Sequence, residues 1–151
     1  YPSLSGAENL QFFASLAGMA VDQVRRDAIL ARLRFPDGAI NKPAGTYSKG
    51  MRQKLGLAIA LMKDARAILL DEPLSGLDPA AANDLVTVFR ETAAGGAALL
   101  VSTHDIFRAK DVASRIGIMR HGRLVDMVDP ATLTAAELEQ LYLTHMAERA
   151  A

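Results

Sequence analysis

The segment Ala67-Ile-Leu-Leu-Asp-Glu-Pro-Leu-Ser-Gly-Leu-Asp-Pro79 decides the predicted fold of this chain. It begins with an unbroken apolar run, which is typical of a central strand in a parallel sheet that is buried on both faces. Asp78 and Pro79 predict a helix start, because Asp is a favoured cap and Pro suits the first helical position. Residues 97–102 form a second apolar run, so we expect a right-handed crossover with two parallel strands whose carboxyl ends share one edge.

Helices are predicted on the N-terminal side of this segment. Ser5 and Glu8 have the Ser-x-x-Glu spacing of a capping box, in which side chains satisfy free amides at a helix start. Apolar residues then recur at helical period, and Pro36 with Gly38 predicts a turn. The expected helices span about 6–18, 21–34 and from Ser48 onward, with a loop before the third.

The C-terminal part of the chain predicts shorter elements. Arg120-His-Gly122 is flanked by two apolar stretches, as in a β-hairpin. The expected elements are a helix over 105–113, strands over 115–119 and 123–127, and a helix over 134–147. We therefore predict an α/β fold with an N-terminal helical subdomain, a parallel sheet, and a C-terminal β-hairpin and helix.

The composition excludes several classes of protein. The 151 residues suit one domain, and a hydrophobic content of 50% suffices for a core. The 17 basic and 17 acidic residues balance, so no global charge favours nucleic acid or an anionic membrane surface. Without cysteine the chain has no disulfide or thiolate metal site, and we expect a cytoplasmic location. No apolar run reaches the roughly 18 residues of a membrane-spanning helix.

Asp71, Glu72 and His104 follow the two predicted strands and are expected at one edge of the sheet, where parallel sheets bind ligands. A single carboxylate such as Asp71 suits Mg²⁺ held through water. Glu72 points differently, so it can deprotonate a water that attacks a γ-phosphate. His104 can donate a hydrogen bond to a phosphate oxygen or to nearby backbone. An isolated Asp-Glu pair is also common at a solvated strand end, so we infer the site from the three residues together.

Ser48 and Gly50 open the third predicted helix, which offers free backbone amides and the positive end of the helix dipole. Glycine at the second helical position lowers helix stability unless another group must approach closely. We expect that group to be an anion. The alternative is an ordinary serine cap with an incidental glycine.

In order and spacing, these segments resemble the nucleotide-binding subunit of ABC transporters. Tyr47-Ser-Lys-Gly-Met51 is similar to the ABC signature, commonly LSGGQ, from which it departs at Tyr47, Lys49 and Met51. The 67–71 strand resembles Walker B with Glu72 as catalytic base. Ser75-Gly-Leu-Asp78 resembles the D-loop. His104 resembles the switch histidine of the family.

The resemblance implies a fold, cofactors and partners. The sheet would be part of a RecA-like P-loop NTPase core, and the cofactors would be ATP and Mg²⁺. Two subunits would pack head to tail, with Asp71, Glu72 and His104 acting on their own subunit's nucleotide. The cofactor-binding residues that would act across the interface are Ser48, Lys49, Gly50, Met51 and Asp78. A membrane permease would be a further partner, so the subunit would lie on the inner face of the cell membrane.

The resemblance also implies a division of the chain. We expect a helical subdomain with the signature at 1–66, the C-terminal half of the ATPase core at 67–128, and a helical tail at 129–151. The segment 1–10 resembles the stretch that follows the Q-loop, and the chain opens without Met, so we expect further sequence before Tyr1.

No G-x-x-x-x-G-K-[ST] motif occurs in this sequence to cradle a nucleotide's phosphates. We therefore predict that the chain neither binds ATP tightly nor hydrolyses it alone. The strand that would carry this motif is missing from the sheet. The open strand edges that this leaves should favour association with another chain or a displaced C-terminal hairpin.

Three functions fit these features. The first is the ATPase subunit of a bacterial exporter, which accounts for every motif. The second is a stand-alone module that caps a partner's nucleotide or docks on a permease without hydrolysis, and the third is a soluble ABC ATPase that acts on ribosomes or DNA. The third should show tandem cassettes or a basic linker, and neither occurs in this sequence.

Overall fold

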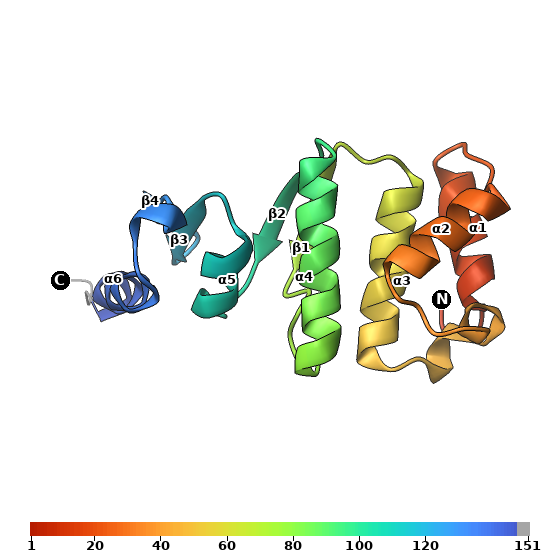
Figure 1. Ribbon diagram of the computed structural model, residues 1–151, viewed down its shortest axis with the longest axis horizontal. Coiled ribbons are helices and arrows are strands. Elements are labelled where there is room, and N and C mark those ends of the chain that lie inside the picture. The colour runs from red at the N-terminus through yellow and green to blue at the C-terminus, as the bar shows by residue number, and fades with distance from the viewer. Residues whose placement is uncertain (148–151) are drawn as a thin grey trace. The chain divides into compact units, whose positions relative to one another are not determined.

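The first part of the chain folds into the three predicted helices, shown in Figure 1. The computed structural model describes residues 1–147. The capping box at Ser5 and Glu8 is present in both directions, and Ser48 caps the third helix as expected. Two short 3₁₀ helices occupy the predicted loop. The bounds are α1 Gly6–Leu16, α2 Gln23–Arg32, η1 Ala39–Asn41, η2 Ala44–Thr46 and α3 Lys49–Met62.

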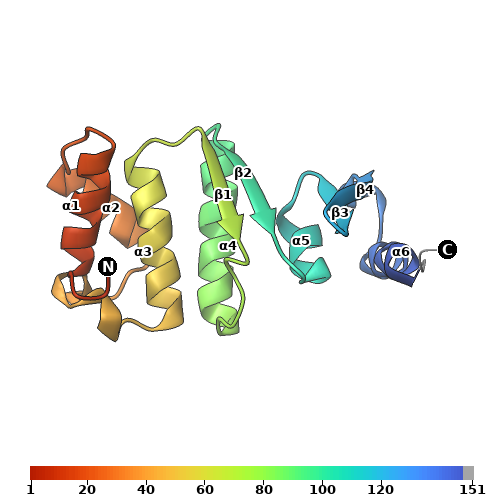
Figure 2. The same ribbon diagram turned by 180° about the vertical axis from the view of Figure 1, so that it is seen from behind.

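Two parallel strands, β1 (Ala67–Asp71) and β2 (Ala98–Ser102), follow and are joined by α4 (Pro79–Ala94). This is the predicted crossover unit, and Asp78 caps α4 with Pro79 as its first residue. Figures 1 and 2 both show α4 between α3 on one side and the two strands on the other. The core of this part is formed by side chains from all four helices, among them Leu10, Leu30, Leu33, Leu55, Leu57, Leu85 and Phe89.

The prediction that β1 and β2 are buried on both faces is wrong for this chain. Ile68 is buried, but Leu69 on β1 is 75% exposed and Leu100 on β2 is 69% exposed. Alternate residues of a strand point to opposite faces, and within this part of the chain α4 covers only one face of the two-stranded sheet.

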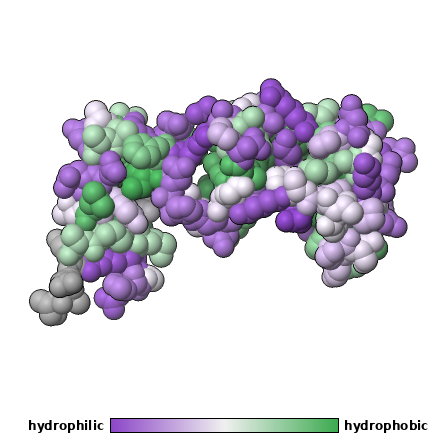
Figure 3. Space-filling model, turned by 90° about the horizontal axis from the view of Figure 1, so that it is seen from below, coloured by the Kyte–Doolittle hydropathy of each residue, from purple (hydrophilic) through white to green (hydrophobic). Residues whose placement is uncertain are grey.

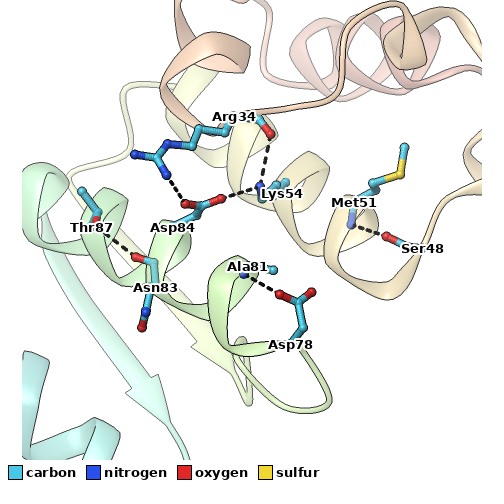
Figure 4. A network of polar contacts seen from close by, with 9 residues as sticks. All are labelled: Arg34, Ser48, Met51, Lys54, Asp78, Ala81, Asn83, Asp84 and Thr87. Carbon is cyan, nitrogen blue, oxygen red and sulfur yellow. Dashed lines mark hydrogen bonds and ion pairs between the residues drawn. The ribbon is translucent and has the colours of Figure 1, made fainter.

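A polar network joins the helical part to α4 (Figure 4). Asp84 on α4 accepts a hydrogen bond from Arg34 at 2.6 Å and one from Lys54 of α3 at 3.2 Å. The Lys54 ammonium also donates to the backbone carbonyl of Arg34 at 3.2 Å. Lys54 is buried, so its charge is held by these two acceptors rather than by water.

The chain divides into two compact units, Tyr1–Ser102 and the part from Thr103 onward. The second unit contains the predicted short helix, hairpin and final helix, and Ile118 and Leu138 are buried in it. The finer division at residues 66 and 128 stays a prediction. The bounds are α5 Ile106–Val112, β3 Ile116–Arg120, β4 Arg123–Val128, η3 Pro130–Thr132 and α6 Ala135–Ala147.

Contacts at the end of α6 attach it to the hairpin of the second unit. Asp126 on β4 lies 2.9 Å from Nε2 of His145, and Arg120 on β3 donates to the carbonyl of His145 at 2.9 Å. The β3–β4 pair forms its own two-stranded antiparallel sheet, separate from β1–β2.

Apolar side chains also reach the surface, visible as green areas among hydrophilic purple in Figure 3. None of the described helices is long and apolar enough to cross a membrane.

Candidate functional site

The carboxyl edge of the β1–β2 sheet carries the two predicted acidic residues. Asp71 ends β1 directly opposite Ser102, the last residue of β2. The Ser102 hydroxyl donates to a carboxylate oxygen of Asp71. The backbone N–H of Glu72 approaches Ser102 at both its carbonyl (3.1 Å) and its hydroxyl (3.2 Å). Ser102 therefore holds both neighbouring acidic residues in place at the strand end.

Ser102 was not among the predicted site residues. Its role depends on the register of β1 against β2, which pairs position 71 with position 102. The sequence offers one indication of this register. Aligning the two apolar runs at their polar ends would pair Asp71 with Ser102.

Glu72 has a left-handed backbone, with φ of 45°. Residues other than glycine, asparagine and aspartate adopt this region rarely, at a cost of about 1–2 kcal/mol. The strand ends one residue earlier, so the chain changes direction at Glu72 and the carboxylates of Asp71 and Glu72 leave the backbone from different conformations. Arg34, Asp64 and His121 have a similar φ, so the role of Glu72 as a base stays a prediction.

The oxygen ligands at this edge suit Mg²⁺, because Asp71 and Ser102 offer one carboxylate and one hydroxyl. Among the described residues, no group of three or more His, Cys, Asp or Glu side chains could enclose a metal ion. A single carboxylate fits Mg²⁺ that keeps most of its water shell, as P-loop enzymes hold it together with nucleotide phosphates.

The start of α3 presents the residues of the signature-like segment. The Ser48 hydroxyl accepts a hydrogen bond from the Met51 amide at 3.2 Å, and the first turn contains no acidic residue. Tyr47 is buried and donates its hydroxyl to the Ala39 carbonyl at 2.7 Å, and its burial raises the pKa of the phenol. Tyr47 thus anchors the segment, while Ser48 and Lys49 are exposed.

The structure supplies a packing reason for Gly50. A Cβ atom at this position would lie 3.3 Å from Cδ2 of Leu77 and 3.9 Å from Cβ of Ala81. Leu77 in the loop before α4 and Ala81 in the first turn of α4 therefore approach Gly50 closely. Contact of Gly50 and Met51 with a phosphate stays a prediction.

Asp78 and His104 complete the predicted set. Asp78 Oδ1 accepts from the Ala81 amide at 3.0 Å and so caps α4. His104 belongs to the second unit and follows Ser102 by two residues in the sequence. The next residue, Asp105, caps α5 by accepting from the Arg108 amide at 2.9 Å. The roles proposed for Asp78 and His104 stay predictions.

Comparisons with known proteins give matches over most of the chain. Residues 3–107 match the family model described as "AAA domain, putative AbiEii toxin, Type IV TA system". The chain is 37% identical over 137 residues to the fluoroquinolones export ATP-binding protein of Mycobacterium tuberculosis, covering 90% of this chain and 44% of that protein. It is 38% identical to an uncharacterized ABC transporter ATP-binding protein of Bacillus subtilis, covering 82% of this chain and 40% of the relative.

Solved structures show the same fold. The ATP-binding subunit of an ABC transporter superposes with a TM-score of 0.80 and 26% identity, covering 97% of this chain and 64% of that one. The chain thus spans less than half the length of the curated relatives it matches. It belongs to the family described as an AAA domain, and over most of its length it is similar to the ATP-binding proteins of ABC transporters.

Proposed function

We propose that this chain is part of an ATP-hydrolysing subunit of a bacterial ABC exporter. The main support is the edge of the β1–β2 sheet, where Asp71 ends β1, Glu72 follows it, and Ser102 hydrogen-bonds both. Export is supported by the Mycobacterium tuberculosis relative, which is a fluoroquinolones export ATP-binding protein.

In the proposed reaction, Asp71 would hold Mg²⁺ with Ser102 steadying its carboxylate, and the metal would neutralise phosphate charge. Glu72 would accept a proton from the attacking water, and its backbone is held by Ser102 while it does so. His104 would donate a hydrogen bond to a phosphate oxygen.

Ser48, Lys49, Gly50 and Met51 would act on the nucleotide of a second subunit. The amides at the start of α3 and the absence of acidic residues in its first turn favour a bound anion. Asp78, at the start of α4, would lie near the same interface. Partners would be a second ATPase subunit, packed head to tail, and a permease, with the complex on the inner face of the membrane and no role for nucleic acid.

The 151-residue chain alone should be inactive, because its sequence has no phosphate-cradling motif. A stand-alone interaction module without hydrolysis is less well supported, since the curated relatives are described as ATP-binding proteins.

Mg²⁺-dependent ATP hydrolysis by the complete subunit, made from its natural coding sequence, tests the proposal. The variant Glu72→Gln should lower kcat by roughly 10²–10⁴-fold, the usual effect of losing a general base, and leave ATP binding intact. Glu139→Gln, on the exposed surface of α6, is the matched control and should keep wild-type activity. Equal activity of the two variants would refute the role of Glu72.

A further inference from the structure

Lys49, the first residue of α3, lies across the loop that joins β1 to α4. At Gly76 of this loop, a Cβ atom would lie 2.9 Å from Nζ of Lys49, 3.5 Å from its Cδ and 3.7 Å from its Cε. The distal half of the lysine side chain therefore packs directly on the glycine. No hydrogen bond or ion pair of the Lys49 ammonium occurs within residues 1–147.

Gly76 is the position in the loop that permits this contact. Its φ of 67° lies in the left-handed region that favours glycine, and the absence of a side chain leaves room for the lysine. A larger residue at this position would require the end of the Lys49 side chain to move away. Lysine stems commonly cover apolar or backbone surface, and in the exposed Lys49 both the end of the stem and Nζ lie against the glycine.

The loop is also held by its own side chains, because Pro73 is buried and Leu74 and Leu77 pack against the hydrophobic core of this unit. Two backbone hydrogen bonds close its turns, from the Ser75 amide to the Glu72 carbonyl at 3.1 Å and from the Leu77 amide to the Leu74 carbonyl at 3.3 Å. Leu77 also lies against Gly50 at the start of α3. The loop begins at the strained Glu72 and ends at Asp78, the cap of α4.

We propose that Lys49 is a positioning residue, which holds the 73–77 loop against α3 through packing of its stem on Gly76. The inference about the loop stands on these contacts alone. Its consequence for catalysis rests on the proposed function. Lys49 would link the signature-like segment, which acts on the nucleotide of a second subunit, to the loop after Glu72, the base that acts on the nucleotide of its own subunit.

Hydrogen exchange of the Ser75 and Leu77 amides in the 151-residue chain, followed by NMR, tests the contact. Lys49→Ala removes the stem and should speed exchange at both amides by roughly fivefold, with α3 and α4 unchanged. Lys49→Met and Lys49→Arg keep the stem and should exchange like the wild type. Lys42→Ala, at another exposed lysine, controls for the lost charge and should have no effect.

Unchanged exchange in Lys49→Ala would overturn the proposal, and so would faster exchange in Lys49→Met, since the ammonium alone would then restrain the loop. Faster exchange throughout α3 and α4 would also overturn it, because the lysine would then stabilise the unit as a whole. No nucleotide is present in this experiment, so its outcome is independent of whether the chain takes part in ATP hydrolysis.

Discussion

Removing Asp84 should destabilise the first unit more than removing either of its partners. The Asp84 side chain is 19% exposed and that of Lys54 is 10% exposed, whereas Arg34 is 74% exposed. Asp84→Ala leaves the Lys54 ammonium buried with only the Arg34 carbonyl as acceptor. Breaking a fully buried pair from one side costs about 3–5 kcal/mol. With this partial exposure we expect about 2–3 kcal/mol.

The other two side chains should matter less. Arg34→Ala removes an exposed ion pair, so the expected loss is below about 1 kcal/mol. Lys54→Met removes the buried charge, keeps most of the stem's packing and leaves Asp84 paired with Arg34, so its expected loss is also about 1 kcal/mol. The double variant Lys54→Met/Asp84→Ala has no stranded charge and should be more stable than Asp84→Ala.

Urea denaturation at neutral pH, followed by circular dichroism, measures these differences. A double-mutant cycle over Lys54 and Asp84 should give a coupling of about 1–2 kcal/mol. The reasoning fails if Asp84→Ala is no worse than Arg34→Ala, or if adding Lys54→Met to Asp84→Ala restores nothing. Either result would mean that water reaches the Lys54 ammonium in the folded chain.

Two further predictions concern the ends of the chain. Ser5→Ala removes half of the capping box of α1 and should lower stability by about 1 kcal/mol in the same urea assay; Ser3→Ala, which caps no helix, serves as control. The hydrogen bond from His145 and the Met127 amide lower the pKa of Asp126. A lowered pKa means that the native state binds this proton less readily than the unfolded chain, so the contribution of Asp126 is present above the ordinary carboxyl pKa of 3.8 and is lost as pH falls below it. Asp126→Asn should flatten that acid-side loss, measured as hydrogen exchange of α6 amides against pH, and an unchanged profile would contradict the assignment.

Features set by neighbouring residues were predictable from the sequence. The Ser5–Glu8 capping box and the Asp78–Pro79 helix start depend on groups within one turn, and both are present. The parallel pairing of β1 and β2 was also predictable, because a strand, helix and strand in succession have one favoured connection.

Features set by distant contacts were not predictable in the same way. Exposure of Leu69 and Leu100 depends on which elements cover the sheet, and an apolar run does not specify them. The link from Ser102 to Asp71 needs the strand register, and the Lys54–Asp84 pair joins residues 30 apart in sequence. The packing of Leu77 against Gly50 is a second reason for a small residue at position 50, and the signature-like segment alone does not indicate it.

The left-handed backbone of Glu72 has a consequence for selection experiments. Glycine or asparagine would relieve the strain at φ 45°, so a screen that rewards folding alone should enrich these residues at position 72. The same replacements would discard the carboxylate that the proposed hydrolysis requires. A single substitution at position 72 would then raise thermal stability and abolish ATP hydrolysis together. A library selected for folding without an activity step would become enriched in well-folded but inactive variants.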